Sequence, residues 1–330
     1  MSRDIEVLHQ KLSAYLPDGK RITGLQPLTA GHSNETYIAE GLNAILRLPP
    51  STPPLLQAHD IITQARIYRE VGQFEGGPPV PAILHICEDP DVLGDPFFMM
   101  EMIAGESLND YIQPQWFTSL ADEKRGDLCR HWVEAIGSIA RLPPLEALGE
   151  AVTPADELRR WQNICHDNDC PRLVALIDRL LQIPAPRSGP VSPAHGDCKI
   201  TNMMFRDQRL AAVLDWELGY NGEPLSDLGY MLYAYQSDFH GPTRTISPSG
   251  MWTREQVIPA WERASGRSAS GLIWYEAAEV AKLGGIYAKA KQLYNTGDSA
   301  DERMLQFIAK LDESIEIISA MLPLVAKTCG

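Results

Sequence analysis

The residue pattern of the chain changes near position 103, and this change limits the folds that the chain can adopt. Before that point, short extended segments alternate with turn residues. After it, apolar residues recur mainly at the three- and four-residue spacing of amphipathic helices. We therefore predict an α+β protein with two parts: an N-terminal lobe over residues 1–103, and a larger, mainly helical lobe over residues 104–330.

The N-terminal part is expected to form a small antiparallel sheet with one helix inserted into it and a short amphipathic helix before it. The first helix is predicted at Ile5–Leu16 and the inserted helix at about Leu55–Val71. The strands are predicted around Ile22–Thr29, Thr36–Glu40, Ala44–Leu48, Ala82–Glu88 and Phe97–Ile103.

The second part is dominated by helical periodicity, with one exception. Ser119–Ala140 and Pro154–Leu181 are long amphipathic stretches, and helices return from Arg254 to the end. Short strand-like pieces lie between Val191 and Leu218, around the most unusual motifs of the chain.

Composition and charge exclude several classes of function. The chain carries 29 Lys and Arg against 43 Asp and Glu, a net charge of −14, which disfavours binding to nucleic acid or to an anionic membrane surface. It contains no run of about 18 apolar residues, and its first residues do not resemble a secretory signal. The six cysteines show no CxxC spacing, so we expect reduced thiols and a cytoplasmic protein. The segment CHDNDC (165–170) fits no zinc pattern and is predicted to be a loop between two helices.

Two strings carry residues suited to phosphoryl transfer. HGDCKITN runs from His195 to Asn202, and Asp215 follows in LDWELG. Phosphoryl transfer requires a carboxylate that accepts the proton of the attacking hydroxyl, and oxygen ligands that hold Mg²⁺ on the phosphates. Asp197 provides the carboxylate, Asn202 and Asp215 provide the ligands, and Lys199 is placed to contact the transferring phosphate. These residues could instead cap a turn and end a strand, but the whole string favours the functional interpretation.

HGDCKITN together with LDWELGYNGEPLSDLGY resembles the aminoglycoside phosphotransferase and choline kinase group, relatives of the protein kinases. TAGHSNETY (29–37), the block 44–107 and GGIYAKA (284–290) extend the resemblance over nearly the whole chain. LRLPP, AHD and CEDPDVLGDPFFMME resemble most closely the kinase-like domains found alone in bacteria or joined to acyl-CoA dehydrogenases. The resemblance implies a protein-kinase-like fold of two lobes and an ATP- and Mg²⁺-dependent kinase acting on a small-molecule hydroxyl.

The resemblance also implies roles for individual residues. Asp197 corresponds to the catalytic base, and Asn202 and Asp215 to the Mg²⁺ ligands. His195 is expected to brace the loop, and Asp227 to be the buried acid that hydrogen-bonds it. For Glu217, two residues after Asp215, a contact with metal or substrate and a solvated carboxylate stay open.

The nucleotide is expected to bind between the lobes. Gly31, Ser33 and Asn34, in the turn GHSN, lie where protein kinases have their glycine-rich loop, although an ordinary hairpin turn would look the same. Backbone groups from Glu101 to Ile103 would pair with adenine. Met204 would form the apolar floor beneath the base or belong to the core. The sequence lacks GxxxxGK[ST], so a P-loop mechanism has no support.

One pair of residues departs from the kinase pattern. Kinases hold the phosphates with a Lys on the third strand, which pairs with a Glu on the next helix. Here Arg47 takes the strand position and Gln64 the helix position, while Glu70 lies on the far side of that helix. A Gln can accept a hydrogen bond from Arg47 but supplies no counter-charge, so either an active kinase or a non-catalytic nucleotide-binding protein is compatible with this pair.

The acceptor is less defined than the reaction. The resemblance points toward a hydroxyacyl thioester or a similar metabolite, with an aminoglycoside or macrolide antibiotic as the alternative. Substrate contacts are expected from the helical lobe, for which residues 159–162 (Arg-Arg-Trp-Gln) are candidates, although an ordinary helix surface with one buried Trp fits them as well. The sequence makes no prediction of the oligomeric state.

Overall fold

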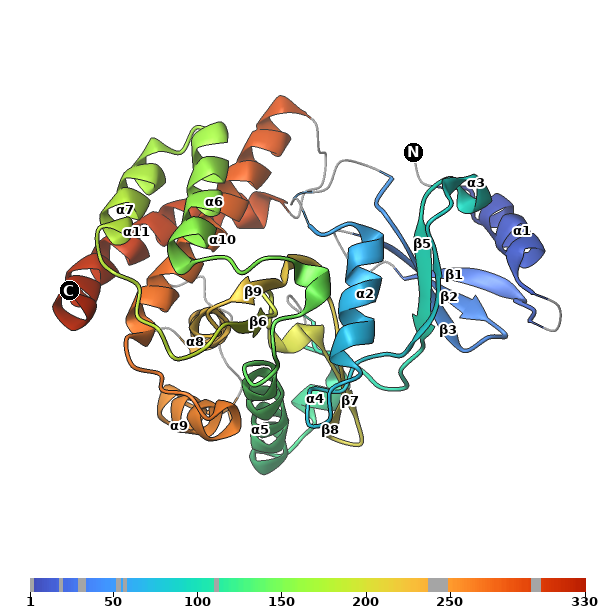
Figure 1. The fold of residues 1–330 in the computed structure, drawn as a ribbon, viewed down its shortest axis with the longest axis horizontal. Helices are drawn as coiled ribbons and strands as arrows, with labels where there is room; N and C mark the ends of the chain where they lie inside the picture. Colours follow the sequence, from blue (N-terminus) through green and yellow to red (C-terminus); the bar gives the residue numbers. More distant parts are fainter. Residues whose placement is uncertain are drawn as a thin grey trace.

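A five-stranded antiparallel sheet forms the N-terminal lobe, and helices form most of the C-terminal lobe (Figure 1). The structure is a computed structural model that describes residues 3–17, 20–28, 34–51, 55, 58–109, 113–236, 249–297 and 304–330. The strands are β1 (Gly24–Leu28), β2 (Glu35–Glu40), β3 (Ala44–Leu48), β4 (Ile83–Cys87) and β5 (Phe97–Glu101), in the spatial order β1-β2-β3-β5-β4. The predicted α+β fold with two lobes is confirmed.

The two faces of the sheet bury different side chains because successive strand residues point to opposite sides. On β3, Leu46 packs into a small apolar cluster with Leu8 and Leu12 of α1 (Ile5–Tyr15). Ile45, on the opposite face, packs toward α2 (Ile61–Val71). Arg47 follows Ile45 on that same face, where it pairs in register with Phe98 of β5. The strand period therefore directs Arg47 toward the side on which α2 lies.

Helix α2 begins six residues later than the predicted start at Leu55. The Asp60 side chain accepts hydrogen bonds from the backbone N–H groups of Ile62 and Thr63, both at 2.9 Å. A capping carboxylate satisfies donors that have no partner inside the helix and favours its first turn electrostatically. The cap at Asp60 therefore ends the preceding Pro-rich segment and starts the helix.

All helices after α3 belong to the C-terminal lobe. The short α3 (Pro90–Leu93) lies between β4 and β5 in the N-terminal lobe. The others are α4 (Gln115–Thr118), α5 (Asp122–Ile139), α6 (Pro154–Asp167), α7 (Pro171–Leu181), α8 (Leu225–Gln236), α9 (Arg254–Ser265), α10 (Leu272–Thr296) and α11 (Met304–Cys329). The stretch Pro154–Leu181 is two helices, because a turn with Asp169 in the left-handed region separates α6 from α7.

Two small antiparallel ribbons lie where the lobes meet (Figure 1). One pairs β6 (Ser192–Ala194) with β9 (Tyr220–Gly222), and the other pairs β7 (Met203–Arg206) with β8 (Arg209–Val213). Short 3₁₀ turns η1 (Glu146–Leu148), η2 (Ile200–Asn202) and η3 (Trp216–Leu218) complete the lobe. The two predicted motifs occupy the connections of these ribbons: HGDCKITN links β6 to β7, and LDWELG links β8 to β9.

The main apolar core crosses the lobe boundary. It joins Ile61 and Tyr68 of α2 and Phe98 of β5 to Trp132 of α5 and Leu228 of α8, among others. Such continuous burial fixes α2 against the C-terminal lobe rather than leaving it on a freely moving sheet. The division at residue 103 therefore stays a prediction, since the core does not divide there.

Two further expectations concern membranes and metals. Among the described helices, none has the length and apolar character that a membrane crossing requires. Cys165 and Cys170 of the CHDNDC segment are buried free thiols on either side of the turn between α6 and α7. Residues 165–167 are the end of α6 and only residues 168–170 connect it to α7, so the loop predicted over the whole segment is shorter than expected. Within the described ranges, no group of three or more His, Cys, Asp or Glu could hold a metal ion.

Candidate active site

The loop HGDCKITN is held by a buried carboxylate. Asp227, in the first turn of α8 and 2% exposed, accepts hydrogen bonds from the N–H groups of His195 at 2.7 Å and Gly196 at 2.9 Å. Gly196 has φ of 79°, and a Cβ at this position would collide with the carbonyl oxygen of Leu218. The hydrogen bonding expected of Asp227 is observed, and it orients the residue immediately before Asp197.

The Asp197 carboxylate has partners on both oxygens. Asn202 Nδ2 donates to Oδ2 at 2.9 Å, and the Tyr230 hydroxyl donates to Oδ1 at 2.5 Å. The Lys199 ammonium lies 3.7 Å from Oδ2. Burial raises the pKa of Asp197, but Lys199, the Tyr230 hydroxyl and more distant cations outweigh burial and hold the pKa below its ordinary value. The carboxylate is therefore ionised and fixed in orientation.

His195 connects this loop to the segment that carries Asp215. Its Nε2 donates to the carbonyl of Leu214 at 2.8 Å, and its Nδ1 accepts from the N–H of Asp197 at 3.2 Å. The Leu214 N–H in turn donates to the carbonyl of Asn202 at 2.9 Å. Both nitrogens of a fully buried ring are thus occupied by backbone partners, which is the bracing predicted for His195.

Asp215 adopts a left-handed conformation, with φ of 67° and ψ of 56°. Asp tolerates this region better than most residues, and the Tyr68 hydroxyl of α2 accepts a hydrogen bond from the Asp215 N–H at 2.8 Å. The side chain is about one third exposed, and its Oδ1 pairs with Arg47 Nη2 at 3.0 Å. Arg47 and Asp215, 168 residues apart in the sequence, therefore meet in the structure.

Gln64 is 1% exposed and lies in a network that does not run through Arg47. Its Oε1 accepts from Asn34 Nδ2 at 3.0 Å, and its Nε2 donates to the carbonyl of His59 at 2.7 Å. The same Asn34 nitrogen lies 3.3 Å from Glu217 Oε2. Glu217 is 6% exposed and sits in η3 rather than on a strand, so the solvated alternative considered for it is wrong.

The buried guanidinium of Arg47 draws its counter-charge from the loop after β8. Burial lowers the pKa of Arg47, but the nearby Asp215, Tyr68 and Glu217 raise it by more. The pKa of Arg47 therefore lies above its ordinary value. Within the described part of the chain, Arg47 Nε has no hydrogen-bond partner. Glu70, on the far side of α2, instead accepts from the N–H of Ala147 at 2.9 Å.

The segment predicted to pair with adenine, Glu101 to Ile103, leads directly to Gly105, which lies against Met204. Among the described residues, the N–H of Glu101 donates to Ala82 and that of Met102 to Asn43, whereas the N–H of Ile103 has no backbone acceptor. Residues 104–106 then run beside β7, where Glu106 and Phe205 exchange two backbone hydrogen bonds of 2.8 Å. An added Cβ at Gly105 would lie 2.5 Å from the carbonyl of Phe205 and 3.6 Å from Met204 Cε.

The structure thus gathers most of the predicted residues into three small groups. Asp197, Lys199 and Asn202 form the first, Arg47 and Asp215 the second, and Asn34 and Gln64 the third. Glu101, Ile103 and Met204 lie beside the connection between the lobes. Gly31 and Ser33 lie outside the described residues.

Sequence reasoning missed three residues that act on these groups. Tyr68 and Tyr230 contact Asp215 and Asp197 through their hydroxyls, and Lys282 of α10 donates to the carbonyl of Gly196. Tyr230 lies three residues after Asp227 in PLSDLGY, so its helical spacing was a usable signal. Nothing in the sequence around Lys282 indicated that it reaches a loop 86 residues away.

Residues 159–162 behave as an ordinary helix surface. Arg159 pairs with Asp156 at 2.7 Å, and Arg160 lies over the ring of the buried Trp161. Gln162 donates to Asp178 of α7 at 2.6 Å. These contacts are made within α6 or to α7. They favour an ordinary helix surface with one buried Trp over a substrate-binding segment.

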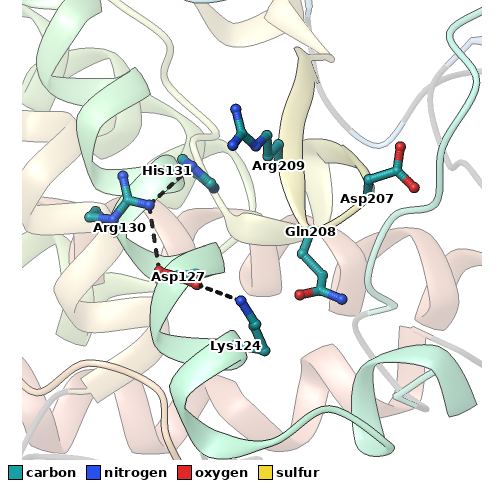
Figure 2. A pocket seen from close by; sticks show the side chains of 7 residues that line it. All are labelled: Lys124, Asp127, Arg130, His131, Asp207, Gln208 and Arg209. Carbon is teal, nitrogen blue, oxygen red and sulfur yellow. Dashed lines mark hydrogen bonds and ion pairs between the residues drawn. The ribbon is translucent and has the colours of Figure 1, made fainter.

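A separate polar hollow of about 320 Å³ lies between α5 and the turn joining β7 to β8 (Figure 2). Asp127 pairs there with Lys124 and Arg130, both at 3.5 Å, and Arg209 of β8 lines the same hollow. The hollow sits at the turn end of the ribbon, about 13 Å along the strands from the end that carries Asn202. It is therefore distinct from the group around Asp197.

The family of the chain follows from comparison of its sequence. Residues 24–285 match the model of the phosphotransferase enzyme family, and the chain belongs to this family. A curated relative, acyl-CoA dehydrogenase family member 11 from Homo sapiens, is 27% identical over 331 residues, which is 93% of this chain and 41% of the relative. The chain thus spans about two fifths of the length of that relative.

Solved structures agree with this assignment at the level of the fold. A Ralstonia eutropha JMP134 protein provisionally named an aminoglycoside phosphotransferase superposes with a TM-score of 0.79 at 21% identity, over 96% of this chain and 98% of that one. An aminoglycoside phosphotransferase bound to AMP-PNP and hygromycin B gives 0.58 at 15% identity, over 96% and 97%. The chain is therefore a member of the phosphotransferase enzyme family with a kinase-like fold.

Proposed function

We propose that the protein transfers the γ-phosphoryl group of ATP to a hydroxyl group of a small organic acceptor, with Mg²⁺ as cofactor. The observation that carries this proposal is the junction of the two motif loops. Leu214 is hydrogen-bonded on one side to His195 and on the other to Asn202, so Asp215 is held beside the loop of Asp197. A base, a cation and two oxygen ligands from separate segments are the groups that this reaction needs.

Asp197 is proposed as the base. The acceptor oxygen forms a bond to the γ-phosphorus, the bond from that phosphorus to the β,γ-bridging oxygen breaks, and the hydroxyl proton passes to the Asp197 carboxylate. The depressed pKa of Asp197 keeps the carboxylate ionised, and its hydrogen bonds to Tyr230 and Asn202 fix its direction. This favours orientation of the hydroxyl over strong basicity, as suits a loose transition state.

The residues present fit a Mg²⁺ ion that takes its other ligands from phosphate and water. Asn202 Nδ2 is engaged with Asp197, so its Oδ1 points the other way, and Asp215 offers a partly exposed carboxylate. Such a site needs few protein ligands, since Mg²⁺ commonly uses one or two protein oxygens. Bound there, the ion would neutralise charge on the β- and γ-phosphates.

Arg47 is proposed to hold the nucleotide phosphates. Its guanidinium is buried, has one unsatisfied N–H group among the described residues, and is paired with Asp215. A guanidinium presents several donors in a plane and can contact two phosphate oxygens at once. Lys199, about one third exposed and next to Asp197, is proposed to contact the transferring phosphoryl group.

For the adenine, we propose the Ile103 N–H as donor, because the N–H groups of Glu101 and Met102 already have backbone acceptors. Met204 is proposed as the apolar floor, since it lies against Gly105 in the same connection. Asn34 and Gln64, which bond each other, would border the phosphates together with Gly31 and Ser33.

A hydroxyacyl thioester or similar acyl metabolite is proposed as the acceptor. The likeness to a protein named as an acyl-CoA dehydrogenase family member supports this choice over an antibiotic, although a fold neighbour bound hygromycin B. The chain would act on the acyl portion through a hydroxyl that Asp197 can reach.

The experiment is a Mg²⁺-dependent ATP-consumption assay with hydroxyacyl thioesters, aminoglycosides and macrolides, with phosphorylated products identified by mass spectrometry. Turnover is expected with an acyl acceptor in the wild type and should disappear in Asp197→Asn, which keeps the size of the side chain. Glu75→Gln, at an exposed position outside the site, is the matched control. Nucleotide binding without turnover across the panel would instead support the non-catalytic reading that Gln64 left open.

A further inference from the structure

Lys282 of α10 is almost completely buried beside the catalytic loop. It is 3% exposed, and its ammonium donates to the carbonyl of Gly196, the residue before Asp197. Glu279 Oε2 lies 3.1 Å from the same ammonium. The rings of Tyr230 and Trp161 lie 5.1 and 5.7 Å from it. A carbonyl, a carboxylate and two aromatic faces therefore replace the water that a buried ammonium has lost.

The same ammonium contacts two of the groups that orient Asp197. The Lys282 ammonium lies over the ring of Tyr230, and the hydroxyl of Tyr230 donates a hydrogen bond to Asp197 Oδ1 at 2.5 Å. Gly196, which accepts from Lys282, carries the peptide bond whose N–H belongs to Asp197 and donates to His195 Nδ1. One cation thus contacts the side-chain partner and the backbone neighbour of the proposed base.

The Gly196–Asp197 peptide needs such a contact because of its conformation. Gly196 has φ of 79°, and glycine passes between backbone conformations that other residues do not reach. Asp227 fixes the N–H side of this residue, whereas its carbonyl is fixed by Lys282. Without the second contact, rotation of the peptide plane would break the bond from Asp197 to His195 and change the direction of the carboxylate.

We propose that Lys282 is a positioning residue of the phosphotransferase, which holds the Gly196 carbonyl and Tyr230 so that the Asp197 carboxylate faces the acceptor. This inference rests on the proposed function of Asp197. It assigns Lys282 a role in turnover beyond its ion pair with Glu279, and it makes Tyr230 the second component of the same brace.

A purely structural explanation makes a different prediction. Buried ion pairs can be replaced by uncharged residues of similar size with little loss of stability, whereas removal of one partner leaves a buried charge. If Lys282 only neutralised Glu279, the double variant Lys282→Met/Glu279→Gln would recover both stability and turnover. If Lys282 positions the loop, the double variant recovers stability and stays slow.

The test compares the double variant, Lys282→Met, Glu279→Gln, Tyr230→Phe and the exposed control Lys291→Met on the full chain. Melting temperature, kcat and KM for ATP and acceptor are measured for each. We expect the double variant to melt near the wild type with kcat lower by about 10- to 100-fold, as for loss of a charged hydrogen bond, and KM for ATP nearly unchanged. Tyr230→Phe should show the same pattern, and Lys291→Met none of it.

Hydrogen–deuterium exchange of the loop 195–202 gives a measurement that does not require turnover. Exchange should be faster in the double variant than in the wild type, and unchanged in Lys291→Met. Wild-type loop protection in the double variant, or full recovery of kcat, would overturn the positioning role. If the double variant exchanges faster than the wild type but the wild type phosphorylates no acceptor, the proposed function is refuted. The contact between Lys282 and the loop would then stand, and the role of Lys282 in turnover would be overturned.

Discussion

Replacement of Gln64 by Glu restores the residue that kinases carry on this helix, and we expect it to harm the protein. In the wild type, the buried Gln64 side chain donates through Nε2 to the partly buried carbonyl of His59 at 2.7 Å. A carboxylate oxygen in that place cannot donate, so His59 loses its partner and faces an oxygen of the same polarity. An unsatisfied buried polar group costs about 1–3 kcal/mol.

The new charge also enters a region that already has an excess of carboxylates. Gln64 Oε1 and Glu217 Oε2 share the Asn34 nitrogen at 3.0 and 3.3 Å, so they are at most ~6 Å apart, where two like charges repel by about 3 kcal/mol at an effective dielectric of ~20. Arg47 offsets part of this repulsion, but Asp215 and Glu217 already compensate its single charge. We take a net loss of about 2 kcal/mol in the free energy of unfolding, which for a chain of 330 residues corresponds to about 3 °C in Tm.

Thermal unfolding of Gln64→Glu without nucleotide measures this loss, and the ATP-consumption assay measures its effect on turnover. The repulsion raises the pKa of the introduced carboxyl, so the deficit should grow as the pH rises from about 5 to about 8, where the carboxyl ionises. Gln73→Glu makes the same chemical change at an exposed position and should stay within about 0.5 kcal/mol of the wild type. A Gln64→Glu variant that is more stable and turns over faster would refute the reasoning. That result would mean that Arg47 lacks a sufficient counter-charge in the wild type.

Three further predictions concern the supports of the site. Burial raises the pKa of Glu279 from 4.5 to about 7, so the folded form binds its proton more tightly than the unfolded form. This difference contributes up to about 3 kcal/mol to the free energy of unfolding below pH ~4.5, and the contribution is lost as the pH rises through 7. Glu279→Gln should flatten that part of the stability profile in denaturant titrations. Asp227→Ala leaves two buried loop N–H groups without an acceptor and should lower the free energy of unfolding by about 3 kcal/mol in urea titrations, with loss of turnover. Gly105→Ala places a methyl group against the Phe205 carbonyl at a φ of 154° and should weaken ATP binding by about tenfold in calorimetry, without equal loss of stability.

The fold was largely predictable because its signals are local. The strands are short alternating segments bounded by turn residues, and the helices carry an apolar stripe, so both are visible within windows of about ten residues. The errors fall where one side chain decides a boundary. The cap at Asp60 moved the start of α2, and the left-handed turn at Asp169 divided a long helical stretch into α6 and α7.

The candidate site was predictable only in part, because some of its contacts join residues within one loop and others join residues far apart in the sequence. Asp197 and Asn202 bond each other within one loop of fixed spacing, and that spacing is visible in the sequence. Lys282 approaches the same loop from a helix 86 residues away, so only the packing of α10 brings it there. Glu217 was ambiguous because a strand was assumed after Asp215, whereas η3 turns its side chain inward to Asn34.

The position of Glu217 offers a physical reason for the neutral residue at position 64. The counter-charge that kinases place on the helix is supplied here from the loop after β8, and the Asn34 amide links Gln64 to the Glu217 carboxylate. This carboxylate lies on the same η3 turn that Asp215 precedes, so both acidic partners of Arg47 belong to one short segment. If Asp215 binds the proposed Mg²⁺, Glu217 would remain as the charge that keeps Arg47 in place. Loss of Glu217, rather than the natural Gln64, is therefore the change that should leave Arg47 without a buried counter-charge during turnover.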